Sequence, residues 1–404
     1  MQSRQVLDGN GAAAEAIRLA RVQVIAAYPV TPQSPIVEKL ARHVAEGSLP
    51  AKYMRVESEH SALSCVIGAQ LTGVRTGTAT SSVGLALMHE VLGVASGCRV
   101  PIVMAVVNRA LVSPWSLWCD HQDTMAERDS GWLQFYAENA QEVLDLLLMA
   151  YRIAEHERVL TPAMVCLDGF FVSHSLQSVT MPDQETVDGF LPAYRAANLY
   201  LDPDDPMFIN GLVPPEDFTE MRYQQLVGFE SALRVIPQVQ EEFFSKFGRR
   251  YEMVEAYRCE DADVVLVTIG SMSGTAKHVV NKQRDQGIPV GVVKLTTFRP
   301  FPVEALRKAL GGARVVGVLD RSAGLGAPSA PVCLEVVAAV RDEGVRVIGY
   351  VGGLGGRDIT ETTVESIFRE LLEIKDGRRS KPVKPWIDVR ADAMTIRPWG
   401  GKAS

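Results

Sequence analysis

Glu57, Glu59 and His60 stand between a short apolar stretch and a helix of small residues in the segment RVESEHSALS. Burial disfavours the charged form of a carboxyl group that is held among apolar neighbours. A carboxyl group in such a place suits proton transfer near neutral pH. The alternative is a solvated acidic turn that caps the following helix. The segment therefore holds a candidate group for proton transfer.

A second group of polar residues follows a strongly apolar strand in the segment VVNRALVSPWSLWCDHQD. Arg109 at the end of the strand is suited to bind a carboxylate with two hydrogen bonds, and the alternative is a surface arginine. Asp120, His121 and Asp123 resemble a metal cluster, but they come from one irregular loop without a distant partner. We therefore predict a hydrogen-bond network there and no metal ligands.

The segment VQVIAAYPVTPQSP, residues 22–35, combines an apolar run with three prolines. The run resembles a buried strand, and Pro29 prevents its simple continuation. Thr31 and Ser34 each precede a proline, which is the pattern of a helix N-cap followed by proline in the first turn. Ligands of open α/β sheets bind beyond the carboxyl ends of the strands, where this segment would lie. A rigid connection without a ligand is the alternative.

Helices and strands alternate along the first part of the chain and must position these residues. Strands are expected at 22–28, 53–56, around RTGTATSS, at VPIVMAVV and at PAMVCLDGF, with helices between them. Alternation of this kind predicts a mainly parallel sheet with helices on both faces.

The remainder of the chain divides into three parts. Residues 175–258 are expected to form an extended connector and a long helical segment in which Pro237 makes a break or kink. Alternation resumes in a second α/β domain at 259–375, where PVGVVKLTTF is expected to form one strand. A C-terminal arm at 376–404 carries Trp386 and Trp399 and either wraps a partner or forms a loose end. The first domain then covers residues 1–174.

The composition excludes several classes of protein. The chain has 404 residues, 47% of them hydrophobic, and a net charge of -7, which gives no basic footprint for nucleic acid. We expect neither a membrane span nor a secretory signal, and hence a cytoplasmic protein. The six cysteines never occur as CxxC, so we interpret them as core residues and expect any iron-sulfur cluster on another chain.

Several motifs occur together in the order found in one family. They are AAYPVTPQSP, the glutamate of ESEHSALSCVIGAQLTG, the arginine of VVNRAL, CDHQD, FRPFP and VGGLGGRDIT. In this order they resemble the alpha subunit of pyruvate:ferredoxin oxidoreductases and related 2-oxoacid oxidoreductases, over residues 5 to about 370. The resemblance implies an α/β fold with a thiamine-enzyme pyrimidine-binding-type parallel-sheet domain and a transketolase C-terminal-like domain.

The resemblance also implies roles for individual residues. Glu59 matches the glutamate that bonds the aminopyrimidine ring of thiamine diphosphate and activates the cofactor. Thr31 matches a threonine that contacts the substrate, and Pro29 and Thr31 are expected beside the cofactor. Arg109 matches the arginine that meets the carboxylate of the 2-oxoacid. Orientation of that acid in a dry pocket favours decarboxylation.

The chain lacks the GDG motif followed by NN with which thiamine enzymes bind diphosphate through a metal ion. The resemblance therefore implies that a beta subunit supplies the diphosphate and Mg²⁺ half of a shared site, together with the nearest iron-sulfur cluster. Gamma and ferredoxin-like delta subunits are further expected partners. Coenzyme A is the expected co-substrate, and ferredoxin or NAD the expected acceptor. The glycine-rich runs DRSAGLGAP and GGLGGRD are expected to form tight turns or subunit contacts, with a coenzyme A or partner role as the alternative.

The expected reaction is oxidative decarboxylation of a 2-oxoacid with coenzyme A. Pyruvate is the commonest substrate of the family, and Trp115 near Arg109 suggests a pocket for an aryl 2-oxoacid such as phenylglyoxylate. Two alternatives remain: a noncatalytic assembly or regulatory subunit, and a nucleotide-dependent dehydrogenase. The absence of a dinucleotide fingerprint counts against the dehydrogenase.

Overall fold

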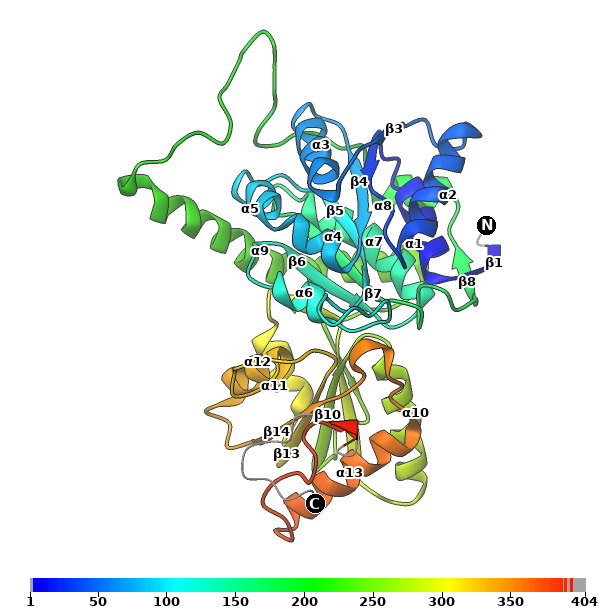
Figure 1. The fold of residues 1–404 in the computed structure, drawn as a ribbon, viewed down its shortest axis with the longest axis vertical. Helices are drawn as coiled ribbons and strands as arrows, with labels where there is room; N and C mark the ends of the chain where they lie inside the picture. Colours follow the sequence, from blue (N-terminus) through cyan, green and yellow to red (C-terminus); the bar gives the residue numbers. More distant parts are fainter. Residues whose placement is uncertain (1–2, 388, 391–392, 395–404) are drawn as a thin grey trace.

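The computed structural model describes residues 3–387, 389–390 and 393–394. Two α/β units lie one above the other in Figure 1, with the first part of the chain in the upper unit and the C-terminal part in the lower one. Each unit is built around its own sheet.

The first sheet has seven strands, and the six from the N-terminal part of the chain pair in parallel. A parallel sheet needs helical crossovers, which agrees with the alternation in the sequence. The order across the sheet is β12 (Thr297–Arg299), β6 (Leu133–Ala137), β7 (Ala163–Asp168), β5 (Val103–Asn108), β4 (Thr76–Thr80), β2 (Val24–Ala27) and β3 (Lys52–Arg55).

Helices cover both faces of this sheet. Val103, Ala105 and Val107 of β5 pack in one apolar cluster, whereas Met104 and Val106 pack in the other, as the alternation of side chains along a strand requires. The first cluster includes α1 (Gly9–Leu19), α2 (Ser34–Ala45) and α7 (Ala140–Ala154). The second includes α3 (Glu59–Leu71), α4 (Ser82–Leu87), α5 (His89–Gly97) and α6 (Gln122–Ala126).

The proline-rich connection between β2 and α2 starts its helix differently from the prediction. The N-cap residue is Gln33, without a side-chain cap bond, and Ser34 is already the first helical residue. The Gln33 side chain donates instead to the carbonyl of Ala79 at 3.0 Å and accepts from the Val30 amide at 3.3 Å. The Thr31 and Ser34 capping prediction was therefore wrong, because a buried glutamine fastens this turn to β4.

The second sheet has five strands, all parallel except the antiparallel edge strand β9. Its order is β14 (Arg346–Val351), β13 (Val315–Asp320), β10 (Val264–Ile269), β11 (Val290–Leu295) and β9 (Val254–Tyr257). The helices of this unit are α10 (Met272–Asp285), α11 (Val303–Leu310), α12 (Pro331–Val340), the 3-10 turn η1 (Leu354–Gly356) and α13 (Glu361–Lys375).

The stretch PVGVVKLTTF forms two strands rather than the one that we predicted. Strand β11 belongs to the second sheet, whereas β12 leaves it and pairs antiparallel with β6 of the first sheet. The amides of Thr296 and Thr297 both donate to the carbonyl of Met253 at 3.0 Å where the chain passes from one sheet to the other. The second half of the chain thus completes the edge of the first sheet, and the RPFP turn follows at this junction.

The connector holds more regular structure than we predicted. Strand β8 (Gln177–Met181) pairs antiparallel with β1 (Ser3–Leu7), which the sequence analysis missed. Helix α8 (Gln184–Phe190) follows, and the side chain of its N-cap residue Asp183 accepts the amide of Thr186 at 2.9 Å. Two strands that pair across about 170 residues leave no local signal beyond their own short alternation.

Helix α9 (Pro215–Phe247) continues through Pro237. Of the break or kink that we predicted at this proline, the break was wrong, and the kink stays a prediction. The C-terminal half of α9 buries Val235, Val239 and Phe243 against the first unit. Its N-terminal half points away from the body of the molecule (Figure 1) and exposes Phe218 and Met221. Packing of the C-terminal half stabilises the helix around a residue that would break an isolated one.

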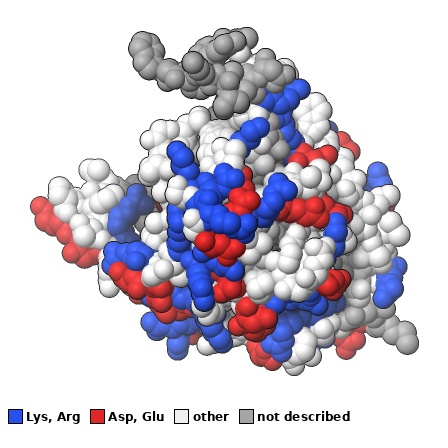
Figure 2. Space-filling model, turned by 90° about the horizontal axis from the view of Figure 1, so that it is seen from below, with Lys and Arg blue, Asp and Glu red and all other residues white. Residues whose placement is uncertain are grey.

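The described part of the C-terminal arm lies against its own domain. The amide of Ile387 donates to the carbonyl of Val351 at 2.9 Å, and Val351 donates to Pro385 at 2.7 Å, so Trp386 runs beside β14. Trp399 lies outside the described residues. The end of the second unit seen in Figure 2 mixes Lys and Arg with Asp and Glu rather than showing one sign of charge. In the described chain, no helix is both long enough and apolar enough to cross a bilayer.

Candidate active site

The carboxyl ends of the parallel strands of the first sheet lie at one edge and carry the predicted site residues. Residues 28–33 follow β2, Glu59 follows β3, residues 81–84 follow β4 and Arg109 follows β5. Because β3, β2, β4 and β5 are neighbours in the sheet, segments separated by many residues in the sequence meet here.

Glu59 is the buried member of the acidic segment, with 7% of its surface exposed. It is the first residue of α3, whose N-cap Ser58 accepts the Ser61 amide at 3.2 Å. Over the described chain, its carboxylate makes neither a hydrogen bond nor an ion pair. A buried acid without a protein partner is costly unless a ligand supplies one.

Gly84 makes room for the Glu59 carboxylate. A Cβ atom at position 84 would lie 2.5 Å from Glu59 Oε1 and 2.6 Å from Thr80 Oγ1. The hydroxyls of Thr80 and Ser81 are buried and lack hydrogen-bond partners in the described structure. A glycine and a free hydroxyl, that of Thr80, therefore lie near the acid.

Glu57 and His60 turn to the surface instead. Glu57 is exposed, and it accepts a hydrogen bond from the Ser61 hydroxyl, which lowers the pKa of its carboxyl group. His60 Nε2 lies 3.6 Å from the carboxylate of Glu90 on α5. Glu57 thus fits the alternative of a solvated acidic turn, in which Ser58 caps the helix, whereas Glu59 is buried.

Arg109 and Thr31 are in direct contact. The Arg109 Nη1 atom donates to the Thr31 carbonyl at 2.7 Å, although 78 residues separate them in the sequence. Arg109 is only 5% exposed, its Nε atom is buried without a partner, and no carboxylate among the described residues forms an ion pair with it. Burial lowers the pKa of Arg109, while the charges of Asp123 and Glu59 act in the opposite direction. Arg109 and Glu59 are thus close enough to interact electrostatically.

The other two predicted residues, Pro29 and Trp115, are exposed. Pro29 lies in the same turn as Thr31, and both residues are exposed. Trp115 is 77% exposed on the segment 111–118, which follows Arg109. The indole of Trp115 is not part of the core and forms no ring contact within the described chain.

The CDHQD motif divides into two separate groups. Asp123 is 2% exposed, and burial raises the pKa of its carboxyl group to about 6. It faces the ends of β4 and β5, where it accepts the backbone amides of Ser82 and Arg109. Asp120 faces the other way and accepts the amides of Gln122 and Gly355.

His121 belongs to a buried cluster between the two units. Its Nε2 atom lies 2.7 Å from Asp168 Oδ1, and Arg321 Nη1 donates to Asp168 Oδ2 at 2.9 Å. Ser271 adds its amide and hydroxyl to the same carboxylate. Burial alone would raise the pKa of Asp168, but His121 and Arg321 outweigh it and hold this pKa well below its usual range.

Cys119, His121 and Asp168 bring potential ligand atoms within 4.8 Å of one another. The Arg321 guanidinium already lies beside two of them, since Nη1 is 3.7 Å from Cys119 Sγ and 2.9 Å from Asp168. A metal ion here would have to displace a buried cation. The geometry agrees with the hydrogen-bond network that we predicted for this motif.

The two glycine-rich runs of the second unit lie at the same interface. A Cβ atom at Gly356 would lie 2.3 Å from Trp118 Cβ, and the Gly356 amide donates to the Cys119 carbonyl at 2.6 Å. In the DRSAGLGAP run, Arg321 binds Asp168 as described above. The glycines of GGLGGRD thus allow the second unit to approach the first within this chain.

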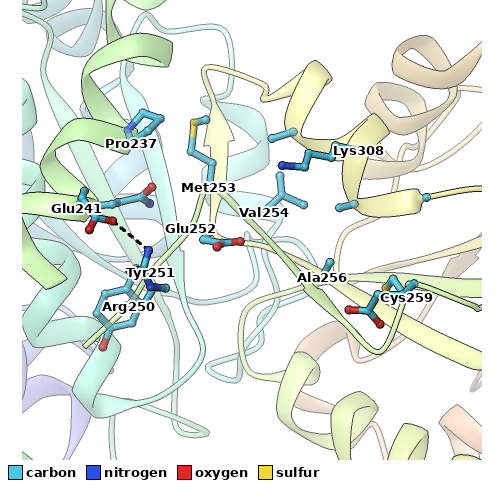
Figure 3. A pocket seen from close by; sticks show the side chains of 15 residues that line it. Pro237, Glu241, Arg250, Tyr251, Glu252, Met253, Val254, Ala256, Cys259 and Lys308 are labelled. Atoms are coloured by element: carbon cyan, nitrogen blue, oxygen red, sulfur yellow. Dashed lines mark hydrogen bonds and ion pairs between the residues drawn. The ribbon is translucent and has the colours of Figure 1, made fainter. Parts of the chain in front are cut away.

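Two pockets of the structure lie away from Glu59, Thr31 and Arg109. A pocket of about 560 Å³ opens between α9, β9 and α11, and Figure 3 shows Glu241 paired with Arg250 at its edge. Another of about 810 Å³ lies near Arg18, Gln23 and Arg75, where Gln23 and Arg75 adjoin the amino ends of β2 and β4. Neither is lined by Glu59, Thr31 or Arg109.

Family models match both units of the chain. Residues 15–241 match the thiamine diphosphate-binding model of pyruvate flavodoxin/ferredoxin oxidoreductases, and residues 262–364 match core domain II of pyruvate:ferredoxin oxidoreductases. The chain belongs to the 2-oxoacid:ferredoxin oxidoreductase family, as an alpha subunit. The resemblance that we found in the sequence motifs is thereby confirmed.

Relatives of this alpha subunit match along nearly the whole chain. The pyruvate synthase subunit PorA of Pyrococcus abyssi is 46% identical over 98% of this chain and 100% of its own length. PorA of Methanocaldococcus jannaschii is 48% identical, over 92% of this chain and 96% of its own. The ketoisovalerate oxidoreductase subunit VorA of Pyrococcus abyssi is 45% identical, over 96% of this chain and 98% of its own.

Solved structures show the same fold. A 2-oxoglutarate:ferredoxin oxidoreductase from Magnetococcus marinus, with 2-oxoglutarate, coenzyme A and succinyl-CoA bound, has a TM-score of 0.68 at 20% identity. The match covers 91% of this chain and 65% of that one. A split-gene transketolase has a TM-score of 0.55 at 12% identity, over 92% of this chain and 100% of its own. The predicted α/β fold class is confirmed.

Sequence analysis missed three parts of this arrangement: Gly84, Asp168 and Arg321. Asp168 and Asp320 each end a buried apolar strand, in VCLD and VGVLD, and Arg321 follows directly. The sequence signal that could have revealed Asp168 and Arg321 was a charged residue at the end of a buried strand. The pairing of Arg321 with Asp168 across 153 residues had none.

Proposed function

We propose that this alpha subunit contributes Glu59, Thr31 and Arg109 to an active site that converts a 2-oxoacid and coenzyme A into acyl-CoA, carbon dioxide, a proton and two electrons. The observation that carries the proposal is that Glu59 and Arg109 are both buried and that neither forms an ion pair with another described residue, while the Arg109 Nε atom also lacks a hydrogen-bond partner. Glu59 matches the basic heterocycle of the cofactor, and Arg109 matches the carboxylate of the 2-oxoacid substrate.

Glu59 fits the aminopyrimidine ring of thiamine diphosphate. Its carboxyl group is buried, unpartnered and bordered by a glycine that keeps the space open. Held there, Glu59 keeps a proton at the ring nitrogen that it faces, which requires a carboxyl group and not merely a polar one. Bound thiamine diphosphate supplies the nucleophilic carbon and the electron sink for decarboxylation.

Arg109 and Thr31 fit the 2-oxoacid. Arg109 already uses Nη1 for the Thr31 carbonyl, so the guanidinium is held in place before the substrate arrives. Its remaining donors orient the substrate carboxylate, and the Thr31 hydroxyl and Pro29 adjoin the reacting groups. Preorganised donors in a buried site bind charge more strongly than exposed ones.

Other chains complete the site in this proposal. Neither of the two pockets described above is lined by the three residues, and the chain has no diphosphate-binding motif. A beta subunit with the diphosphate and Mg²⁺ half and an iron-sulfur cluster would supply the missing wall. Gamma and delta subunits, and ferredoxin or NAD as the acceptor, belong to the same proposal.

The boundaries that we predicted between the domains of this chain, at residues 174, 258 and 375, stay a prediction.

Pyruvate is the substrate that we propose first. The relatives named above are called pyruvate synthase and ketoisovalerate oxidoreductase subunits, which favours an aliphatic 2-oxoacid. The hypothesis that phenylglyoxylate is the substrate depends on Trp115. This side chain is 77% exposed and would line a pocket only if a partner chain covered it. Each candidate makes a different prediction for a panel of 2-oxoacids.

The decisive test uses the complex purified with its native partners. After cofactor and iron analysis, coenzyme A-dependent reduction of a dye is measured with pyruvate, ketoisovalerate, 2-oxoglutarate and phenylglyoxylate. We expect Glu59→Gln to lower kcat by about 10²-fold or more, because the amide cannot hold the proton.

Glu57→Gln is the matched control, since it changes an exposed neighbour that bonds only Ser61 among the described residues. It should leave turnover unchanged. Equal turnover of the Glu59→Gln and wild-type complexes would instead favour the noncatalytic subunit, and NAD binding by the isolated chain would favour the dehydrogenase.

A further inference from the structure

One buried carboxylate, that of Asp123, joins the ends of two neighbouring strands beneath the candidate site. Its Oδ2 atom accepts the backbone amides of Ser82 and Arg109, each at 3.0 Å. Its Oδ1 atom accepts the side-chain amide of Asn108 and the backbone amide of Thr124, each at 2.8 Å. Four donors therefore converge on a side chain that is 2% exposed.

One of these bonds holds a residue with an unusual backbone conformation. Ser82 follows β4 with a φ of 50°, in the left-handed region that residues other than glycine seldom adopt. Its hydroxyl donates to the Ala110 carbonyl at 2.6 Å, so Ser82 and the residues after β5 are tied twice. Strain of this kind persists only where surrounding contacts determine the conformation.

Both candidate catalytic groups depend on the backbone that Asp123 holds. Arg109 donates its backbone amide to Asp123, and the end of its side chain donates to the Thr31 carbonyl. The other bonded amide, that of Ser82, begins α4, and Gly84 of that helix borders the Glu59 carboxylate. A shift of either amide would move a group that faces the ligands.

We propose that Asp123 is a positioning residue that sets the orientation of Arg109 toward the carboxylate of the 2-oxoacid without touching the substrate itself. This inference rests on the proposed function, since it assumes the role of Arg109. The proposed role applies to Asp123 and not to His121 of the same motif. The His121 side chain bonds Asp168 instead.

The experiment measures kcat and KM for the preferred 2-oxoacid with the assembled complex. Asp123→Ala should raise KM by about 10- to 100-fold, because a displacement of about 1 Å in a substrate-binding group has effects of this size. Asp123→Asn should recover part of the loss, since its amide oxygen can still accept the Ser82 and Arg109 amides, whereas its NH2 group cannot accept the donors of Asn108 and Thr124. The Arg109→Ala/Asp123→Ala double variant should lose far less than the product of the single losses, because both changes act through the same side chain.

Asp145→Ala is the matched structural control. Asp145 on α7 is as buried as Asp123 and bonds Arg249 and Tyr251, away from β4 and β5. This variant should lower the melting temperature as much as Asp123→Ala without changing KM. Hydrogen exchange of peptides covering residues 81–84 and 108–110, measured without substrate, should rise in Asp123→Ala and not in Asp145→Ala.

The outcomes separate the inference from the function on which it rests. If Arg109→Ala raises KM and Asp123→Ala does not, or if the two losses multiply, the positioning role is overturned and the proposed function stands. If Arg109→Ala itself leaves KM unchanged, the proposed substrate site fails.

Discussion

Two buried carboxylates at the carboxyl ends of strands, Glu59 and Asp168, have opposite surroundings. Asp168 is bonded by His121, Ser271 and Arg321 and joins the two units of the chain. Glu59 is almost as buried but bonds none of the described residues. Their positions at the ends of parallel strands are similar, so position alone does not separate structure from function. The completeness of the hydrogen bonding does.

This difference has a physical basis. A buried carboxylate whose bonds are complete contributes to the fold, and the loss of one partner leaves an uncompensated charge. A buried carboxylate without partners weakens the fold unless a ligand completes its bonds. We therefore assign Asp168 to the interface between the units and Glu59 to the proposed site.

The largest predicted effect is on stability, at Asp168. Asp168→Ala should destabilise the protein by about 3–5 kcal/mol, because it leaves Arg321 buried without its counter-charge. Glu59→Gln, a change at an equally buried position, should cost less than about 1 kcal/mol. Urea unfolding of the two purified complexes measures both. Equal destabilisation would remove the distinction between the two acids.

Asp320 is a third buried carboxylate at the end of a strand and can be compared with Asp168. Asp320 accepts the backbone amides of Val332 and Cys333 and has no cationic partner among the causes of its pKa shift, and burial raises the pKa of its carboxyl group to about 7. A raised pKa means that the folded state binds the proton more tightly, so the contribution to stability is present below pH 4 and is lost as the pH rises to about 7. The expected loss is on the order of 4 kcal/mol.

Asp168 should act in the opposite direction, with its contribution present above pH 4 and lost as the pH falls. Unfolding of wild type, Asp320→Asn and Asp168→Asn from about pH 2 to 8 tests both signs, since the Asp168 contribution is lost only below about pH 4. Stability of the Asp320→Asn protein should no longer fall between pH 4 and 7 through this group. A wild-type slope retained in full by this variant would contradict the assignment.

A smaller effect is expected on activity when the space beside Glu59 is filled. Gly84→Ala places a methyl group 2.5 Å from Glu59 Oε1. It should lower kcat/KM by about 10-fold, because the carboxyl group must move away from its ligand. Gly93→Ala on α5 is the control, since a Cβ atom there meets nothing within 4 Å. Full activity of the Gly84→Ala complex would argue against the proposed orientation of Glu59.

The smallest effect is expected at Trp115. Because this side chain is 77% exposed, Trp115→Ala should change stability by no more than about 0.5 kcal/mol. If a partner chain makes the indole a pocket wall, the ratio of kcat/KM for phenylglyoxylate to that for pyruvate should fall. An unchanged ratio would remove the aryl 2-oxoacid hypothesis.

Local sequence patterns were sufficient to predict much of the fold of this molecule. The β-α alternation, the parallel sheets and the strand-end positions of Glu59, Thr31 and Arg109 all follow from apolar periodicity and turn residues, which act over a few residues. The motif order indicated the family, and the family models and relatives confirmed it.

Tertiary structure decided what depends on contacts between distant segments. The passage of β12 into the first sheet, the pairing of β1 with β8 and the continuation of α9 through Pro237 were missed or wrongly predicted. Pairing energy and packing against another element outweighed local propensity in each.

The sequence by itself determined which residues stand at the ends of the strands, because side-chain type and turn chemistry are local properties. Only the tertiary structure decided which of these residues are satisfied: Asp168 finds Arg321 across 153 residues, whereas Glu59 finds no partner in the described chain. Solvation and hydrogen bonding of a buried charge depend on every segment packed around it, and no local pattern in the sequence contains that information.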